Sequence, residues 1–141
     1  MEIHILWGGP GQGKSTYIAE QLGLWAAAKK IALSRTLVLG PTGVACVSLA
    51  DSLGSLPRGE LQIMTLARFA LLGPGLPPTP QFDAVVIDEF WACSTEQLLA
   101  VRGALQSRLA ARFCLLLSGD PMQLPPPDNA AHKLHTEWIS T

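Results

Sequence analysis

The stretch GGPGQGKST, from Gly8 to Thr16, directly follows an apolar run at residues 3–7, within a predicted strand at residues 2–7. The run predicts a short buried strand, and the residues after the stretch have the periodicity of a helix. The stretch matches the Walker A pattern in full, with Lys14 and Ser15 at its end. Glycines let backbone N–H groups curl around a phosphate without Cβ clashes, and the positive end of the following helix adds to the field. The chain is therefore predicted to begin with a strand, a phosphate-binding loop and a helix; a glycine-rich turn without a ligand is the weaker alternative.

The individual residues of this loop have expected roles. Lys14 is expected to reach the β- and γ-phosphates, and the hydroxyl of Ser15 is expected to bind Mg²⁺. The predicted nucleotide-binding residues are Gly8, Gly9, Pro10, Gly11, Gln12, Gly13, Lys14, Ser15 and Thr16.

A pair of acids follows a second apolar run, in the string VVIDEF from Val85 to Phe90. Acids at the carboxyl end of a buried parallel strand face the crevice where such sheets bind ligands. Asp88 is expected to hold Mg²⁺ directly or through water, and Glu89 to orient and deprotonate an attacking water. The predicted reaction is hydrolysis; the alternative is a solvated pair of acids at a strand end.

The string LLLSGDPMQLPP, Leu115 to Pro126, begins within a further predicted strand at residues 112–118 and continues past its end. In sheets of this type that strand commonly lies between the two Walker strands, which would place Gln123 near the γ-phosphate. A neutral amide there can sense the phosphate without adding charge. The alternative is a proline-rich turn with an incidental glutamine.

The remaining pattern alternates strands and helices, which predicts an α/β fold. We expect a P-loop NTPase (RecA-like) domain with a mostly parallel sheet of about five strands and helices on both faces. Ser94 and Gln97 resemble a capping box before a helix with Leu98, Val101, Leu105 and Leu109 on one face. The predicted strands are residues 2–7, 36–40, 82–88 and 112–118, and the other predicted helices are residues 15–30, 44–50 and 64–72.

Composition limits the function classes. Of 141 residues, 48% are hydrophobic and 15% are charged, against the usual ~25% charged, and the net charge is −1. The low charge suggests an exposed apolar face for a partner, and no global basic field indicates nucleic acid. No apolar run reaches the ~18 residues that span a membrane. Cys46, Cys93 and Cys114 have no paired metal spacing, so buried thiols in a reducing compartment, the cytoplasm or nucleus, are expected.

Taken together, these strings resemble the first RecA-like ATPase domain of superfamily 1 helicases, in the RecD-like and PIF-type branch. GGPGQGKST resembles motif I, VVIDEF motif II and GDPMQLPP motif III. PTGVAC, from Pro41 to Cys46, resembles motif Ia, and MTLARF, from Met64 to Phe69, lies where motif Ib is found. The resemblance departs from the pattern at Val44, where motif Ia usually has lysine, and at Ala67, near the usual motif Ib histidine.

The resemblance implies an ATPase of helicase type with ATP and Mg²⁺ as cofactors. It implies that Lys14, Glu89 and Gln123 are catalytic, that Ser15 and Asp88 bind the metal, and that Gln123 couples nucleotide state to nucleic acid. It also implies that the phosphate backbone of single-stranded DNA or RNA is contacted by Pro41, Thr42, Gly43 and Thr65.

The resemblance covers residues 1–127 as one ATPase domain, with residues 128–141 as a C-terminal tail. Motifs IV to VI and the arginine finger of the second RecA-like domain are not in the sequence, so we expect a second polypeptide or domain to carry them. Such a chain suits a compact viral or mobile-element product, or part of a split helicase. Two other functions remain open: a nucleotide-gated interaction module with little turnover, and a small-molecule kinase, against which Glu89 and Gln123 argue.

Overall fold

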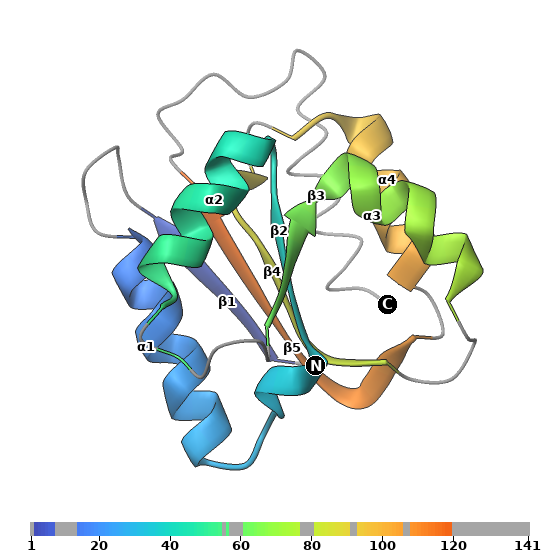
Figure 1. The fold of residues 1–141 in the computed structure, drawn as a ribbon. Coiled ribbons are helices and arrows are strands. Elements are labelled where there is room, and N and C mark those ends of the chain that lie inside the picture. Colours follow the sequence, from blue (N-terminus) through green and yellow to red (C-terminus); the bar gives the residue numbers. More distant parts are fainter. Residues whose placement is uncertain are drawn as a thin grey trace.

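The fold was examined in a computed structural model, which describes residues 2–7, 14–54, 56, 61–76, 81–90, 93–105 and 108–119. A five-stranded, all-parallel sheet is covered by helices on both faces (Figure 1). The strand order is β1-β5-β4-β2-β3. The strands are β1 (Glu2–Trp7), β2 (Thr36–Gly40), β3 (Gln62–Thr65), β4 (Phe82–Ile87) and β5 (Leu109–Gly119). The α-helices are α1 (Lys14–Ala27), α2 (Gly43–Ser52), α3 (Leu66–Leu72) and α4 (Thr95–Leu105). The predicted fold class is confirmed.

Side chains alternate across the sheet, and this alternation builds two cores. Val38, Val86 and Leu116 are buried on the face covered by α1 and α2. Their neighbours in sequence, such as Ile87 and Leu117, are buried on the face covered by α3 and α4. The inner strands β2 and β4 therefore read as nearly continuous buried runs, as expected of a parallel sheet that is covered on both sides.

The helix after the phosphate-binding stretch ends earlier than expected. The predicted face is confirmed: Ile18, Leu22 and Trp25 are buried, and Ala26 packs against them. The helix ends at Ala27 rather than Lys30 because Lys29 is left-handed, with φ of 60°. The N–H of Lys29 donates to the carbonyl of Ala26 and that of Lys30 to the carbonyl of Trp25, which is the Schellman pattern that stops a helix.

The helix predicted at residues 64–72 is wrong at its start. Residues 62–65 form β3, which pairs in parallel with β2, and α3 begins only at Leu66. Thr65 ends the strand, and its hydroxyl accepts a hydrogen bond from the N–H of Arg68. This N-cap separates strand from helix and makes Met64 a strand residue.

The other boundaries differ by a few residues. The helix α2 runs from Gly43 to Ser52 rather than over residues 44–50, while β4 ends at Ile87, so that Asp88 lies in a turn. Leu109 was expected on the face of the fourth helix, but α4 ends at Leu105 and Leu109 begins β5.

The predicted capping box of α4 is confirmed. The N–H of Ser94 donates to the side chain of Gln97 at 3.3 Å, and the N–H of Gln97 donates to the hydroxyl of Ser94 at 3.2 Å. Within the part of the chain that is described, no helix is long and apolar enough to cross a membrane.

Candidate functional site

The carboxyl ends of all five strands lie at one edge of the sheet, because the strands are parallel. Strand β5 lies between β1 and β4, as expected of the strand between the two Walker strands. The ends of β1 and β4 therefore lie at the same edge, separated by the end of β5. The helix α1, which begins at Lys14, packs on one side of this edge.

Asp88 lies where β4 ends, and two hydrogen bonds fix its position. Its backbone N–H donates to the carbonyl of Leu39 in β2 at 2.9 Å, which continues the sheet one residue past the strand. Its Oδ1 accepts a hydrogen bond of 2.5 Å from the hydroxyl of Ser118 in β5. Asp88 and Ser118 each lie two residues after a side chain that packs towards α1, namely Val86 and Leu116. The carboxylate of Asp88 is thus held on the α1 side of the sheet.

Glu89 follows in a turn with an unusual backbone conformation. Its φ of 53° is left-handed, which costs a residue with a Cβ atom about 1–2 kcal/mol relative to right-handed backbone. The thiol of Cys93 donates to the carbonyl oxygen of Glu89 at 3.4 Å, and the N–H of Cys93 to the carbonyl of Phe90 at 3.2 Å. Strained backbone of this kind occurs at functional sites that the surrounding structure holds in place.

Two thiols lie near these acids. Burial, and after it the charges of Asp88 and Glu89, raises the pKa of Cys93 to about 12, so this thiol stays protonated and able to donate. Burial also raises the pKa of the half-buried Cys46, against a hydrogen bond from the backbone of Gly40, and the charge of Asp88 adds to the increase. The expectation of buried thiols is confirmed for Cys93 and Cys114, and Cys46 is only partly covered.

Helix α2 packs closely against the sheet beside Asp88. A Cβ atom on Gly40 would lie 3.0 Å from the Sγ of Cys46 and 3.4 Å from a methyl carbon of Leu49. Glycine at the end of β2 therefore allows the first turns of α2 to pack directly over this strand.

The residues expected to contact nucleic acid lie at two neighbouring strand ends. Gly40 in β2 is paired with Thr65 in β3, so the turn after β2 and the end of β3 are side by side. Thr42 caps α2 by accepting a hydrogen bond from the N–H of Ala45 at 3.1 Å, as Thr65 caps α3. Each hydroxyl uses a lone pair for its cap and keeps its hydrogen to donate. Thr42 and Gly43 are exposed, whereas Pro41 and Thr65 are half-buried.

Several predicted site residues lie outside the described part of the chain, namely residues 8–13 and Gln123. Lys14 is the first residue of α1, and Ser15 and Thr16 follow in its first turn. The structure thus brings together, at one sheet edge, the start of α1, the two acids and the two capping threonines.

The sequence reasoning did not single out Ser118 as a site residue. Its signal was its place in the string LLLSGD: a polar residue at the end of an apolar strand, in step with Leu116 on the α1 side. No group of three or more potential metal-binding His, Cys, Asp or Glu residues occurs among the residues that the structure describes. A site built from the described acids would therefore need ligands from elsewhere, such as phosphate or water.

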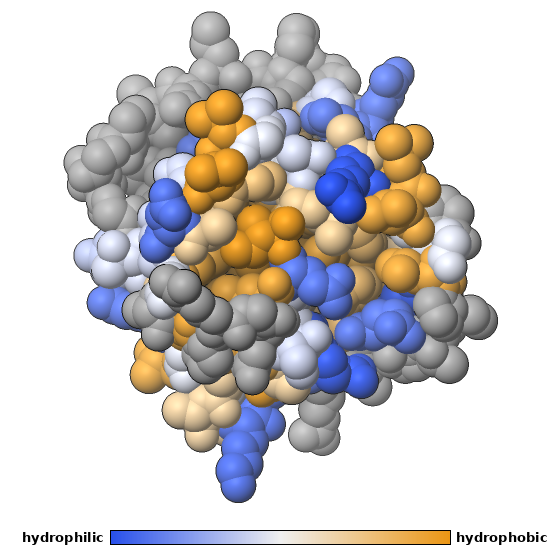
Figure 2. Space-filling model, in the orientation of Figure 1, coloured by the Kyte–Doolittle hydropathy of each residue, from blue (hydrophilic) through white to orange (hydrophobic). Residues whose placement is uncertain are grey.

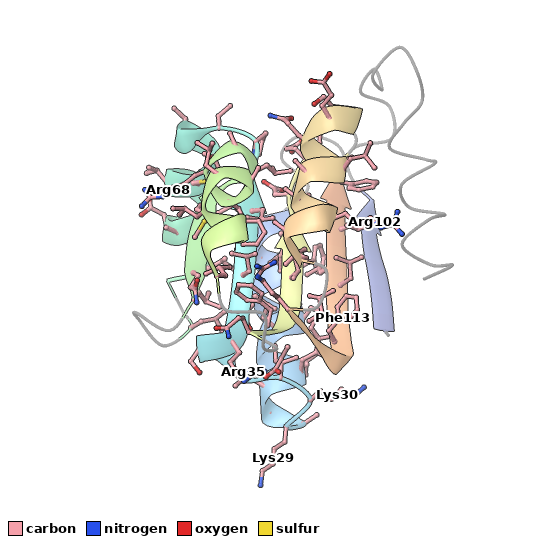
Figure 3. All side chains as sticks on the ribbon, turned by 90° about the vertical axis from the view of Figure 1, so that its right-hand side faces the viewer. Lys29, Lys30, Arg35, Arg68, Arg102 and Phe113 are labelled. Atoms are coloured by element: carbon pink, nitrogen blue, oxygen red, sulfur yellow. The ribbon has the colours of Figure 1, made fainter. Side chains whose placement is uncertain are left out.

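The labelled basic residues do not gather at the candidate site (Figure 3). Lys29, Lys30 and Arg35 lie at the lower end of the view, and Arg35 directly precedes β2, so this end is opposite the candidate site. Arg68 projects from α3 in the upper half and is exposed, and Arg102 on α4 is half-buried. Of these five, only Arg68 is next to a predicted nucleic-acid contact, Thr65.

Comparison with protein families gives the class of this domain. The sequence model of one family, described as an AAA domain, matches residues 1–128. The chain belongs to this AAA domain family. Among curated proteins, none matches the sequence significantly.

Solved helicase structures share the fold. The UvsW helicase from Bacteriophage T4 matches with a TM-score of 0.64 and 15% identity, over 93% of this chain and 51% of that one. The NS3-like helicase from Alongshan virus matches with a TM-score of 0.60 and 18% identity, over 84% of this chain and 32% of that one. Bacteroides Pif1 bound to ssDNA matches with a TM-score of 0.55 and 18% identity, over 97% of this chain and 33% of that one.

These findings confirm the resemblance to a RecA-like helicase domain. The chain spans only 32% to 51% of the three solved chains. At this level of identity the likeness concerns the fold, which is the P-loop type used to bind nucleotides.

Proposed function

We propose that this chain binds Mg-ATP and hydrolyses it, as the motor domain of a superfamily 1 helicase-like protein that acts on single-stranded nucleic acid. The observation that carries the proposal is the position of Asp88. Its carboxylate is fixed at the end of β4, on the sheet face where α1 packs, with β5 lying between β4 and the Walker A strand β1. The acid and the end of β1, which directly precedes the glycine-rich stretch, thus lie at one edge although they are far apart in sequence.

The donors at this edge suit Mg²⁺. Asp88 offers a carboxylate oxygen and Ser15 a hydroxyl, and hard oxygen ligands together with phosphate are what Mg²⁺ prefers. Oδ1 of Asp88 is engaged by Ser118, and no hydrogen bond from a described residue occupies Oδ2. In this proposal Ser15 and Asp88 hold the ion, which when bound neutralises charge on the phosphate oxygens.

The hydrolytic step is assigned to Glu89. In the proposal its carboxylate accepts a proton from the attacking water, while Lys14 holds the terminal phosphates and Gln123 senses the γ-phosphate. The left-handed backbone of Glu89 supports this role, because it fixes the direction of the Cα–Cβ bond of Glu89, the residue directly after Asp88. The residues of the glycine-rich stretch, Gly8 to Thr16, are proposed to surround the phosphates.

Single-stranded nucleic acid is proposed to cross the ends of β2 and β3. Thr42 and Thr65 can donate their hydroxyl hydrogens to phosphates, and Pro41 and Gly43 shape the exposed turn between β2 and α2. The exposed guanidinium of Arg68 would add one positive charge beside them. A second RecA-like domain, in the same protein or in another polypeptide, would carry motifs IV to VI.

An interaction module gated by nucleotide is the second candidate, and the surface of α2 favours it. Val44 is 82% exposed and Val47 is 65% exposed, three residues apart on one face of this helix. Figure 2 shows apolar surface over α2. The resemblance expects a lysine at Val44, so here an apolar side chain replaces a charge beside the proposed strand-binding turn.

Phosphate release tests these two functions. The motor is expected to hydrolyse ATP faster when single-stranded DNA or RNA is added. Glu89→Gln should still bind nucleotide but lose turnover, and Lys14→Ala should lose nucleotide binding. Nucleotide binding without stimulated release would reject the motor in favour of the module, and release by Glu89→Gln at the parental rate would reject Glu89 as the base.

A further inference from the structure

Two polar side chains of the described core are buried, and only one of them forms its hydrogen bond with a residue nearby in sequence. Thr36 is 0% exposed, and its hydroxyl donates to the carbonyl of Ala32 four residues earlier at 3.0 Å. Ser118 is 1% exposed and donates to an acid thirty positions away in sequence, Asp88. A buried hydroxyl costs free energy unless it is paired, so the partner of Ser118 is a defined part of the fold.

The hydrogen bond from Ser118 restricts what Asp88 can offer to a ligand. At 2.5 Å it has the length of a charge-assisted bond from a hydroxyl to a carboxylate, the strong kind. Ser118 cannot readily move, because it is paired with Leu6 of β1 and directly follows Leu117, which is paired with both β1 and β4. Oδ1 of Asp88 is thereby fixed in place and has one lone pair engaged, whereas no described residue donates to Oδ2, which is therefore the more available oxygen.

We propose that Ser118 determines which divalent cation this site accepts, by holding Asp88 as a ligand with a single available oxygen. Mg²⁺ requires six near-ideal octahedral ligands and is usually held through single carboxylate oxygens or water. Ca²⁺ takes six to eight ligands and readily accepts both oxygens of a carboxylate. A hydroxyl fixed on one of those oxygens therefore favours Mg²⁺ over Ca²⁺. This inference rests on the nucleotide site of the proposed function.

Removal of the hydroxyl should change metal preference more than nucleotide affinity. In Ser118→Ala both oxygens of Asp88 become available and the carboxylate is free to rotate. Removing a group that orients a metal ligand typically weakens metal affinity by about 10–100-fold. We expect the Mg²⁺ concentration for half-maximal nucleotide binding to rise about tenfold, while the Ca²⁺ concentration stays equal or falls. Binding of nucleotide without metal should not change.

The experiment measures binding of a fluorescent ATP analogue to the full chain during titration with MgCl₂ or CaCl₂. It compares the parent, Ser118→Ala and Ser118→Thr, which retains a hydroxyl. Thr36→Val is the matched control, because it removes the other buried hydroxyl at the opposite end of the sheet. Far-ultraviolet circular dichroism verifies folding, and Ser118→Cys, a poorer donor of the same shape, replaces the alanine variant if that variant does not fold.

The outcomes distinguish failure of the Ser118 inference from failure of the proposed function. A lower Mg²⁺ to Ca²⁺ preference in Ser118→Ala, retained in Ser118→Thr and in Thr36→Val, supports the inference. An unchanged Mg²⁺ to Ca²⁺ preference in folded Ser118→Ala overturns the inference. A change of the same size in Thr36→Val also overturns it. Either result leaves the proposed function standing. If the parent chain binds no nucleotide in the presence of Mg²⁺, the proposed function itself fails.

Discussion

The backbone at Glu89 leads to a prediction in which two variants differ in stability but lose activity equally. Glycine adopts the left-handed region without the Cβ clash that costs other residues about 1–2 kcal/mol. Glycine also gains more conformational entropy than alanine on unfolding, which lowers its free energy of unfolding by about 0.5 kcal/mol and offsets part of this advantage. Glu89→Gly should therefore be more stable than Glu89→Ala by about 1 kcal/mol, since both lack the carboxylate and only alanine keeps the Cβ atom at φ of 53°. Both variants should lose ATP hydrolysis.

Lys29 supplies the matched control, because its φ of 60° is the same kind of backbone at the far end of α1. The free energy of unfolding of Lys29→Gly should exceed that of Lys29→Ala by a similar amount, about 1 kcal/mol. Neither variant should affect ATP hydrolysis. Urea unfolding followed by circular dichroism gives the free energies, and thermal melts should separate each pair by about 3–5 °C. If alanine is as stable as glycine at position 89 while the pair at position 29 differs, the left-handed turn after Asp88 is wrong.

Three further predictions concern packing, ionisation and the nucleotide site. A Cβ atom on Gly73 would overlap that of Ala104, so Gly73→Ala should lower the free energy of unfolding by about 1–3 kcal/mol. A Cβ atom on Gly103 in α4 would meet open space, so Gly103→Ala should raise the free energy of unfolding by up to about 1 kcal/mol. Urea unfolding measures both. Between pH 9 and 12 the thiol of Cys93 ionises only in the unfolded chain, because its pKa is raised from 9.0 to about 12 in the folded one. The stability of the parent should therefore fall with rising pH by about 1.4 kcal/mol per unit more steeply than that of Cys93→Ser, and parallel slopes would contradict the burial of this thiol. Lys14→Ala should abolish binding of a fluorescent ATP analogue without shifting the thermal melt, and retained binding would remove Lys14 from the phosphate site.

Much of the architecture follows from the sequence, because the apolar runs of a covered parallel sheet are hard to mistake. The run from Phe82 to Ile87 and the start of α1 after the glycines were found from local pattern alone. The capping box at Ser94 was found for the same reason, since both of its hydrogen bonds are local.

The missed strand shows where local pattern becomes insufficient. Residues 62–65 are only four long, lie at the edge of the sheet and are half-exposed, so they lack the buried run of the inner strands. Ile63, Leu66 and Phe69 also have helical spacing. Pairing with β2, a contact across more than twenty residues of sequence, decides in favour of a strand.

The candidate site was predictable as a set of motifs but not as a geometry. The sequence indicates two acids after β4 and an apolar strand before Gly119. It does not show that β5 aligns Leu117 with Ile87, which places Ser118 beside Asp88. The left-handed turn at Glu89 is equally invisible to sequence reasoning, because glutamate has no preference for that conformation.

The central claim is that one magnesium ion and one triphosphate are held between the start of α1 and the acid at the end of β4. A crystal structure of the chain with Mg²⁺ and a non-hydrolysable ATP analogue tests it most directly. The account predicts the ion at about 2.0–2.1 Å from the hydroxyl oxygen of Ser15, with Asp88 Oδ2 as a direct ligand or one water away. Nucleotide bound elsewhere, or an ion that neither Ser15 nor Asp88 approaches, would contradict it.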